Sequence, residues 1–439
     1  MFVIDKTDAV YAPLIGADPR KQRHYVTNVV KMTFTIGGDG TLTPLPKSDQ
    51  PGLQGDVTYM DDLGRSLKYP SDIPERKPLV DVTVNADACA PRGEPVTRLP
   101  VALSVAGHRK ELLVYGNRRW QTDEAGLAYI SDPESFTRMP LRWENSFGGM
   151  TIRQNPLGKG QGAAPGTERD ETPVYPLPNV EDPNNLIGPA NLEPAPVGFG
   201  AIPVFWETRE RKFGTRDLFW ANFRAPDPPK DYDPRYENAA PDDQQFQDLR
   251  GDEILALENM DPEQPHFRIA LPALRPRLFF VPFHDTDRQL RPLDLRLDTV
   301  HVDMHDRQLT MLWRGTFEHG FEDFPKATAY LYLETEPLYE PLSDTAYQDK
   351  FNALLPDYEL AFEAETLTAE SMHEKIFPTV IDAIVKAFQD VEADESVIAT
   401  FQSSTDPQTL YEKGQNLHEE KTQAIHEMLE AVKRKYGQN

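Results

Sequence analysis

The sequence predicts a mainly β body, built as an antiparallel, sandwich-like structure with long ordered loops, followed by an α-helical C-terminal part, so that the whole is α+β. Turn-forming residues stop abruptly near residue 342: 37 of the 40 prolines and all five tryptophans lie before that point. Proline and glycine form turns and are excluded from helix interiors. The same change of composition predicts two domains, residues 1–342 and 343–439.

The strands expected in the first part are short, rich in β-branched and aromatic residues, and bounded by turn residues. A hairpin is expected between two of them, across Gly107-His108-Arg109. The closely spaced turns favour a sandwich over a fold that alternates strands and helices. The expected strands span residues 24–36, 81–86, 99–107, 110–116, 277–282, 299–304, 309–315 and 327–334.

Residues 155–241 contain 15 prolines, which is too many for regular strands or helices. The segment also holds many large aromatic side chains, a composition that disordered segments lack. We therefore expect an ordered but irregular region that wraps around the sheets. Its aromatic residues include Phe199, Phe205, Trp206, Phe219, Trp220 and Phe223.

The C-terminal part has helical periodicity and is acidic, with 8 basic and 19 acidic residues from Ser343 onward. Thr368 is a typical N-cap. An apolar stripe follows at four-residue spacing, and a last helix is expected between Asp406 and residues 433–435. The stripe predicts either packing on the body or a partner-binding surface, and it consists of Ile376, Val380, Ile384 and Phe388.

Charge and composition narrow the classes of partner. The 46 basic and 71 acidic residues give 46 − 71 = −25, a field that repels nucleic acid and anionic membranes. The sequence has no apolar run of the roughly 18 residues that a membrane span needs. Asp5 interrupts any signal peptide, and the single cysteine, Cys89, cannot form an internal disulfide. We expect a cytoplasmic protein that binds neither nucleic acid nor membrane.

Motifs for catalysis are scarce. The sequence has no Gly-x-Ser-x-Gly elbow, and residues 158–162 lack the Lys-Ser/Thr end of a phosphate loop. One set of residues has the composition of a zinc or iron site: His301, Asp303 and His305 alternate along an expected strand and would share one face. The alternative is a solvated outer face opposite the buried Val300, Val302 and Met304. We favour the second interpretation and expect no metal, no cofactor and no catalytic residue.

A series of short motifs carries a resemblance to a known family. In chain order they are Arg142-Trp143-Glu144-Asn145-Ser146-Phe147-Gly148-Gly149, Asn155-Pro156-Leu157-Gly158-Lys159-Gly160, Leu177-Pro178-Asn179-Val180-Glu181, Pro196-Val197-Gly198-Phe199-Gly200, Ala240-Pro241-Asp242-Asp243-Gln244, Gly251-Asp252-Glu253, Leu271-Pro272, Leu297-Asp298-Thr299 and Trp313-Arg314. Over roughly residues 20 to 315, this order resembles the bacterial family called domain of unknown function 2169, which is found with type VI secretion effectors. The helical part lies outside these motifs.

The resemblance implies a non-enzymatic adaptor or chaperone that holds a toxic effector in the cytoplasm. Such a protein helps to load its effector on the spike, made of a valine-glycine repeat protein and often a PAAR tip. The resemblance supplies no catalytic residues. Trp143 and Phe147 are expected first as core residues; alternatively, they line a groove that receives a peptide. Two other functions stay open at this point, a metal-dependent or carbohydrate-active enzyme and a structural component of a secretion or phage-like assembly.

Overall fold

The computed structural model describes residues 2–18, 23–62, 64–74, 76–125, 127–162, 176–223, 225, 227–282, 288–320 and 329–365. The chain divides into two compact units, residues 1–348 and 349–439. Ile376, Val380, Ile384 and Phe388 lie outside the described residues, so their roles stay predictions.

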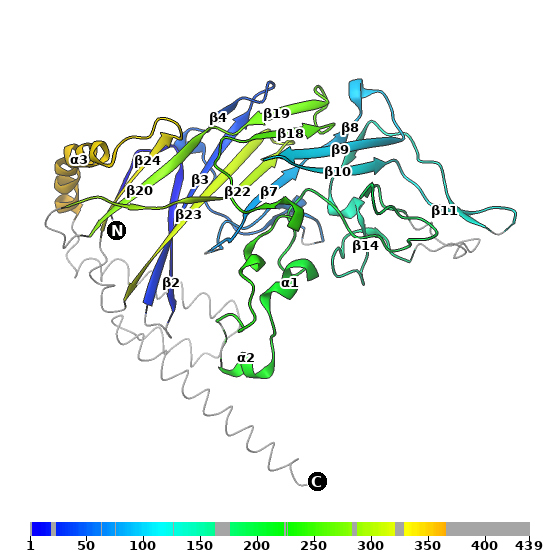
Figure 1. The fold of residues 1–439 in the computed structure, drawn as a ribbon, viewed down its shortest axis with the longest axis horizontal. Coiled ribbons are helices and arrows are strands. Elements are labelled where there is room, and N and C mark those ends of the chain that lie inside the picture. The colour runs from blue at the N-terminus through cyan, green and yellow to red at the C-terminus, as the bar shows by residue number, and fades with distance from the viewer. Residues whose placement is uncertain are drawn as a thin grey trace, which may run out of the picture. The chain divides into compact units, whose positions relative to one another are not determined.

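The largest sheet of the first unit has seven strands, in the order β17-β7-β22-β23-β3-β2, with β4 paired to β3 (Figure 1). Most neighbours in it are antiparallel, but β7 and β22 run parallel. Parallel neighbours cannot be joined by a tight turn, so the long stretch of chain between these two strands forms a crossover connection. The strands are β2 (Val10–Asp18), β3 (Arg23–Ile36), β4 (Leu42–Pro44), β7 (Val80–Asn85), β17 (Gln245–Phe246), β22 (Arg296–Asp303) and β23 (Gln308–Gly320).

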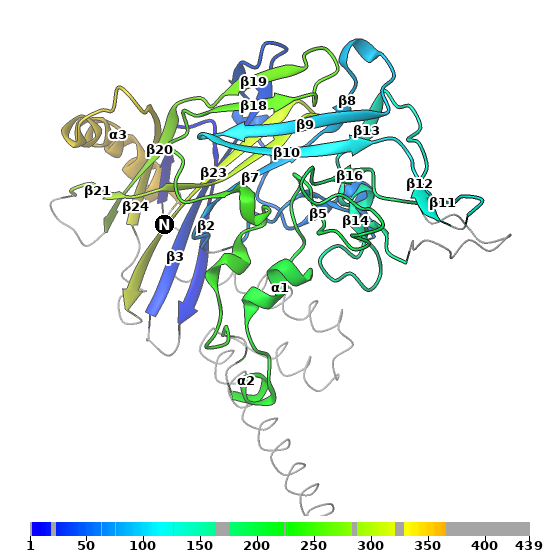
Figure 2. The same cartoon turned by 45° about the vertical axis from the view of Figure 1, so that its right-hand side comes forward.

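A second sheet has five strands in the order β16-β10-β9-β18-β19 and lies against the first (Figure 2). The predicted hairpin is present between β9 and β10, but its turn is Ala106-Gly107, with φ of 50° and 78°. Two positive φ angles are typical of a two-residue hairpin turn, so His108 and Arg109 already belong to a strand. The strands are β9 (Arg98–Val105), β10 (His108–Tyr115), β16 (Val180–Glu181), β18 (Ile254–Glu258) and β19 (His266–Ala270).

The main hydrophobic core forms between these two sheets. Alternate residues of β3, among them Val30, Met32 and Phe34, point to the same buried cluster as Leu103 of β9 and Leu257 of β18. Side chains on one face of each strand therefore supply the core, as alternation along a strand requires. The mainly β body predicted from the sequence is confirmed.

A third sheet has four strands in the order β1-β24-β20-β21, and β1 runs parallel to β24. The prediction of a wholly antiparallel architecture is therefore wrong, because this sheet and the largest one are mixed. The strands are β1 (Phe2–Asp5), β20 (Leu274–Pro282), β21 (Arg291–Leu293) and β24 (Ala329–Pro337). Short two-stranded pairs complete the body: β5 (Val57–Thr58) with β6 (Leu67–Tyr69), β8 (Asp87–Cys89) with β13 (Arg138–Pro140), β11 (Trp120–Thr122) with β12 (Ala128–Ile130), and β14 (Phe147–Gly148) with β15 (Lys159–Gly160).

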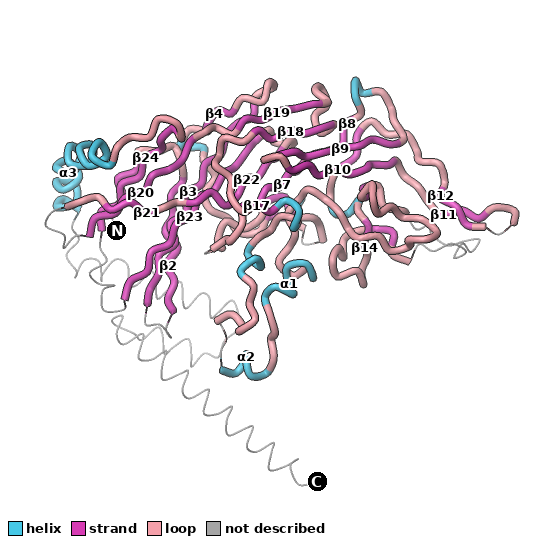
Figure 3. Tube along the Cα trace, viewed as in Figure 1, coloured by secondary structure: helices cyan, strands magenta, loops and turns pink. Residues whose placement is uncertain are grey.

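Helices are few within the described residues, as Figure 3 shows. Two short helices, α1 (Glu207–Phe213) and α2 (Leu218–Phe223), lie in the proline-rich region, where only irregular structure was expected. The long helix α3 (Asp344–Glu365) begins just after the predicted domain boundary. Its Tyr347 is fully buried and donates a hydrogen bond to Oε2 of Glu336 at 2.6 Å, so the start of α3 belongs to the first unit.

Candidate functional site

The second face of the seven-stranded sheet is polar but buried. Thr83, His301, Thr310 and Thr33 lie next to one another across β7, β22, β23 and β3, and each of them is at most 5% exposed. The hydroxyls of Thr33 and Thr310 are 3.0 Å apart. The expectation of a solvated outer face here is wrong. Leu67, Ala201 and Ala239 form a small apolar cluster of their own. The chain segments around them also supply partners of the polar layer, such as Tyr69 against His301 and Asn238 to Asp81.

Three ion pairs cross this polar layer, and all their side chains are nearly inaccessible to water. Lys31 Nζ lies 2.8 Å from Asp72 Oδ2, Lys77 Nζ lies 3.1 Å from Asp81 Oδ2, and Arg314 pairs with Asp298. A buried pair is tolerated only where further hydrogen bonds satisfy it, because both charges lose their hydration. For example, the hydroxyl of Tyr69 donates a hydrogen bond to Oδ1 of Asp72 at 2.8 Å.

The structure does not bring His301, Asp303 and His305 together as one ligand set. Strand β22 ends at Asp303, so His305 lies in the following turn, where alternation no longer applies. His305 Nε2 instead lies 3.0 Å from Asp87 Oδ1, and Asp303 Oδ1 accepts the backbone N–H of His305 at 2.9 Å. Among the described residues, no group of three or more histidine, cysteine or acidic side chains is arranged to hold a metal.

His301 is held inside the polar layer by neighbours on both ring nitrogens. Its Nδ1 lies 2.8 Å from the Thr83 hydroxyl, and its Nε2 lies 3.4 Å from Nδ2 of Asn85. The Tyr69 ring packs edge-on against it, with centroids 5.0 Å apart. Burial lowers the pKa of His301 to about 4, while the charge of Asp303 opposes this shift. The imidazole is therefore neutral near pH 7.

Trp143 and Phe147, the two motif residues considered for a peptide groove, are 5% and 2% exposed. The Trp143 ring packs edge-on against Trp206 at 5.5 Å, and its Nε1 donates to the carbonyl oxygen of Ala201 at 3.1 Å. Phe147 lies in a separate apolar cluster with Trp120 and other residues. Internal contacts take up both side chains, so the groove interpretation is wrong for this structure and the core interpretation holds.

The first three sequence motifs of the family resemblance meet around these two aromatic residues. Nδ2 of Asn155 donates to the carbonyl oxygens of Trp143 and Phe147, at 2.8 and 2.9 Å. At Gly148, a Cβ atom would lie 2.1 Å from the carbonyl oxygen of Asn155, so only glycine fits there. The Asn179 N–H donates to the Asn145 carbonyl at 2.8 Å. These three motifs are thus separate in the sequence but shape one structural element.

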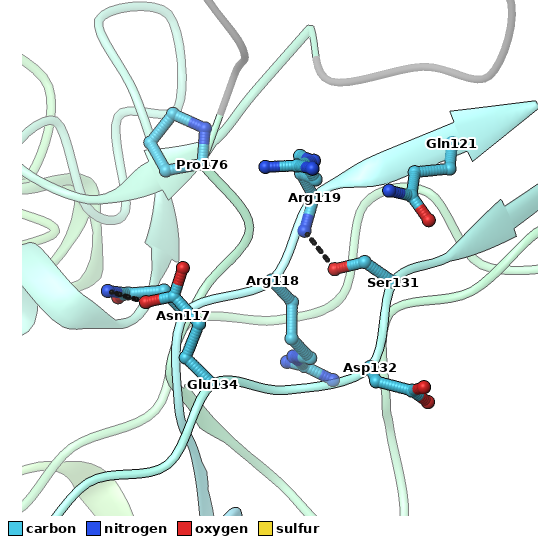
Figure 4. Close-up of a pocket in the computed structure, with 8 residues that line it drawn as sticks. All are labelled: Asn117, Arg118, Arg119, Gln121, Ser131, Asp132, Glu134 and Pro176. Carbon is cyan, nitrogen blue, oxygen red and sulfur yellow. Dashed lines mark hydrogen bonds between the residues drawn. The ribbon is translucent and has the colours of Figure 1, made fainter.

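A polar cleft of about 490 Å³ lies beside the β11–β12 hairpin. Figure 4 shows Nδ2 of Asn117 bonded to Glu134, at 3.0 Å, and the backbone N–H of Arg119 bonded to the Ser131 hydroxyl, at 3.1 Å. The guanidinium of Arg118 is tied to Glu181 and to the carbonyl oxygen of Pro178. The cleft offers hydrogen-bonding groups, and Ser131, the one hydroxyl side chain among its described lining residues, accepts the backbone N–H of Arg119. Its described lining residues are Asn117, Arg118, Arg119, Gln121, Ser131, Asp132, Glu134 and Pro176.

Within the proline-rich region, residues 205–223 and 227–237 form an arm, and α1 and α2 are its regular parts (Figure 2). Several large apolar side chains of this arm are exposed. Leu218 is 82% exposed, Phe205 61% and Phe219 59%. The base of the arm is well packed: the Phe213 ring contacts the rings of Trp220 and Tyr236, with centroids 5.9 and 5.1 Å apart.

Sequence reasoning missed both helices of the arm, although one signal was available. Glutamates in the first turn of α1, basic residues in its last turn and Gly214 directly after it are the usual marks of a helix. The proline content of the surrounding segment hid them.

Among the described residues, no helix is both long and apolar enough to cross a membrane. No curated protein and no solved structure is significantly similar to the chain. A family described as an uncharacterized protein conserved in bacteria (DUF2169) matches residues 21–314, which confirms the resemblance drawn from the motifs. Because this match covers more than half of the 439 residues, the chain belongs to the bacterial DUF2169 family.

Proposed function

We propose that this protein is a non-enzymatic adaptor that binds a type VI secretion effector in the cytoplasm. In this role it helps to load the effector on the spike, through the valine-glycine repeat protein or a PAAR tip. The proposal starts from the order of the sequence motifs. The exposed apolar arm is the structural observation that carries it furthest.

The arm has the properties of a protein-binding element. Leu218 and Phe205 expose most of their apolar surface to water. This exposure is unfavourable in free energy, and a protein–protein contact that buried the two side chains would remove the penalty. The aromatic packing of Phe213 with Trp220 and Tyr236 holds the base of the arm in place, so little order would be lost on binding. Large apolar side chains on a prepared support are typical of the residues that dominate binding energy.

The polar layer supports a structural role better than a catalytic one. His301 is 3% exposed and its two ring nitrogens already have neighbours within the fold. A general acid or base must reach the proton that it transfers. We therefore place the function on the surface of the molecule and assign the buried ion pairs to the stability of the body.

The test is co-purification of the effector with the full-length protein from a strain that carries the whole secretion cluster. The double variant Phe205→Ser/Leu218→Ser removes two exposed apolar anchors and should weaken effector binding at least about tenfold, or 1.4 kcal/mol. Ile254→Ser is the matched control, since Ile254 is 52% exposed but lies on β18, outside the arm. We expect Ile254→Ser to bind as the unmodified protein does.

Three results would contradict the proposal. If the arm variant and the control bind the effector equally well, the arm is not the contact. If the protein co-purifies with assembled sheath and baseplate instead of with an effector, it is a structural component. Turnover of a carbohydrate or another substrate by the purified protein would favour an enzyme.

A further inference from the structure

A small cavity of about 240 Å³ opens at the edge of the buried polar layer. Its walls come from the loop before β7, from the short helix Pro234–Glu237, from the start of β22 and from the middle of β23. Four of the described lining residues are cationic and one is acidic, a formal charge of 4 − 1 = +3 in a chain whose net charge is −25. The charged residues are Arg76, Lys77, Arg296, Asp298 and Arg314.

The inner cations of this cavity are held firmly by the fold. Lys77 Nζ contacts Asp81 Oδ2 at 3.1 Å and donates to the Thr299 hydroxyl at 2.9 Å, and its side chain is 1% exposed. Arg314 pairs with Asp298 and donates to the carbonyl oxygen of residue 72 at 2.6 Å. Nε of Arg314 is buried and has no hydrogen-bond partner among the described residues. A buried donor without a partner is uncommon and points to a missing acceptor.

The outer cations lie at the mouth of the cavity and remain accessible. The guanidinium of Arg296 donates to the carbonyl oxygens of Pro78, at 3.2 Å, and of Gln247. Neither acceptor is a carboxylate, so these contacts orient the guanidinium without neutralising its charge. Arg76 is exposed beside it. The described contacts of Arg296 therefore leave its positive charge without a neutralising carboxylate at the mouth of the cavity.

We propose that this cavity binds a small oxyanion, either a phosphate ion or a carboxylate. Its volume is below the roughly 300–1,000 Å³ of sites for drug-sized ligands, which excludes a nucleotide. Guanidinium groups match the geometry of carboxylate and phosphate oxygens, and their bonds to anions are stronger than bonds between neutral groups. The ring carbons of Pro78 and Pro234 supply an apolar wall beside the charged one. This inference concerns the isolated protein and does not rest on the adaptor role.

The experiment is calorimetric titration of the full chain, in a phosphate-free buffer of low ionic strength, with two probes. Inorganic phosphate represents a free anion, and N-acetylglycine represents a carboxylate carried by a polypeptide. We expect saturable binding of at least one probe and competition between the two if both bind. The tighter probe identifies the source of the oxyanion.

Substitutions test whether the probes bind in this cavity. Arg296→Gln should weaken the tighter probe at least about tenfold, as expected for the loss of a charged hydrogen bond. Arg268→Gln changes the net charge equally on β19, outside the cavity lining, and should stay within about twofold of the unmodified protein. If Arg296→Gln does not fold, Arg76→Gln at the exposed mouth replaces it. The proposal is overturned if neither probe binds saturably, or if Arg268→Gln weakens binding as much as the cavity variant does.

Discussion

The buried His301 makes the stability of the body depend on pH in a defined direction. Burial lowers its pKa from 6.5 to about 4, so the native protein keeps this imidazole neutral under conditions in which the unfolded chain protonates it. Protonation of the unfolded chain alone favours unfolding. The contribution of His301 is therefore complete above pH 6.5 and is lost progressively as the pH falls toward 4.

The size of the effect follows from the two pKa values. Each pKa unit corresponds to about 1.36 kcal/mol, so a change from 6.5 to about 4 is worth roughly 3 kcal/mol. His301 is 3% exposed, and its ring packs against Tyr69 and the Thr83 hydroxyl, so solvent does little to reduce this figure. Marginal domain stabilities of about 5–15 kcal/mol make such a loss easy to measure.

The assay is urea unfolding of the full chain and of the His301→Gln variant at several pH values between 7.5 and 4. Glutamine retains a hydrogen-bonding amide near Thr83 and Asn85 but does not titrate. Carboxylates contribute to both curves and cancel in their difference. We expect the advantage of the unmodified protein to shrink by roughly 3 kcal/mol between about pH 6.5 and 4. A difference that stays constant over this range, or that grows as the pH falls, would refute the assignment of a buried neutral histidine.

Three further predictions concern packing, charge and the C-terminal part. Gly116→Ala places a Cβ atom 1.7 Å from a backbone carbonyl oxygen, and it should lower the free energy of unfolding by at least about 1–3 kcal/mol in urea. In the control Gly52→Ala, the added Cβ meets no atom within 4 Å and should be tolerated. Equal effects of the two substitutions would contradict the packing described at Gly116. Lys31→Met leaves Asp72 buried without its cation and should cost roughly 3–5 kcal/mol, and an unchanged denaturation midpoint would show that the pair is dispensable. A chain ending at Glu365 removes the predicted apolar stripe of the tail and should fold but bind its effector about tenfold more weakly, while unchanged affinity in pull-down titrations would exclude the tail as recognition element.

The body of the fold was predictable because local patterns decide it. Val82 and Val84 alternate with Asp81 and Thr83 along β7, and the apolar members point to the core as the alternation requires. The parallel pairing of β7 with β22 was not predictable in this way. Alternation says which residues share a face, but it contains no information on which distant strand lies beside it or in which direction that strand runs.

The candidate site was harder to predict, since a polar face of a strand looks the same whether it is covered or exposed. His301, Asp303 and the threonines of neighbouring strands have the pattern of an outer face, and only the segments folded over them reveal that they are buried. The cationic cavity was even harder to predict from the sequence. Arg296 and Arg314 are register partners on the neighbouring strands β22 and β23, but Arg76 lies far before them in the sequence, and nothing local indicates that it meets them.

The distribution of charge connects these features. Among the described residues, seven basic and seven acidic side chains are buried, so the interior is neutral and the excess of −25 belongs to the rest of the chain. The buried basic residues are Lys31, Lys77, Lys110, Arg118, Arg209, Lys212 and Arg314, and the acidic ones are Asp72, Asp81, Glu181, Asp261, Asp298, Asp303 and Glu336. Such a surface attracts basic partners over distances of about a Debye length, roughly 8–10 Å, and repels anions.

At short range, the positive charge of the cavity opposes the negative potential of the rest of the chain. An oxyanion approaching the protein meets net negative charge until it reaches the mouth, where the Arg296 guanidinium acts on it directly. Salt screens the repulsion between separated charges more than it screens contacts inside a partly buried cavity. Added sodium chloride should therefore weaken oxyanion binding less steeply here than at an exposed cationic patch. An acidic surface therefore favours basic protein partners, whereas the proposed oxyanion site acts only on an anion that reaches the arginines at the mouth of the cavity.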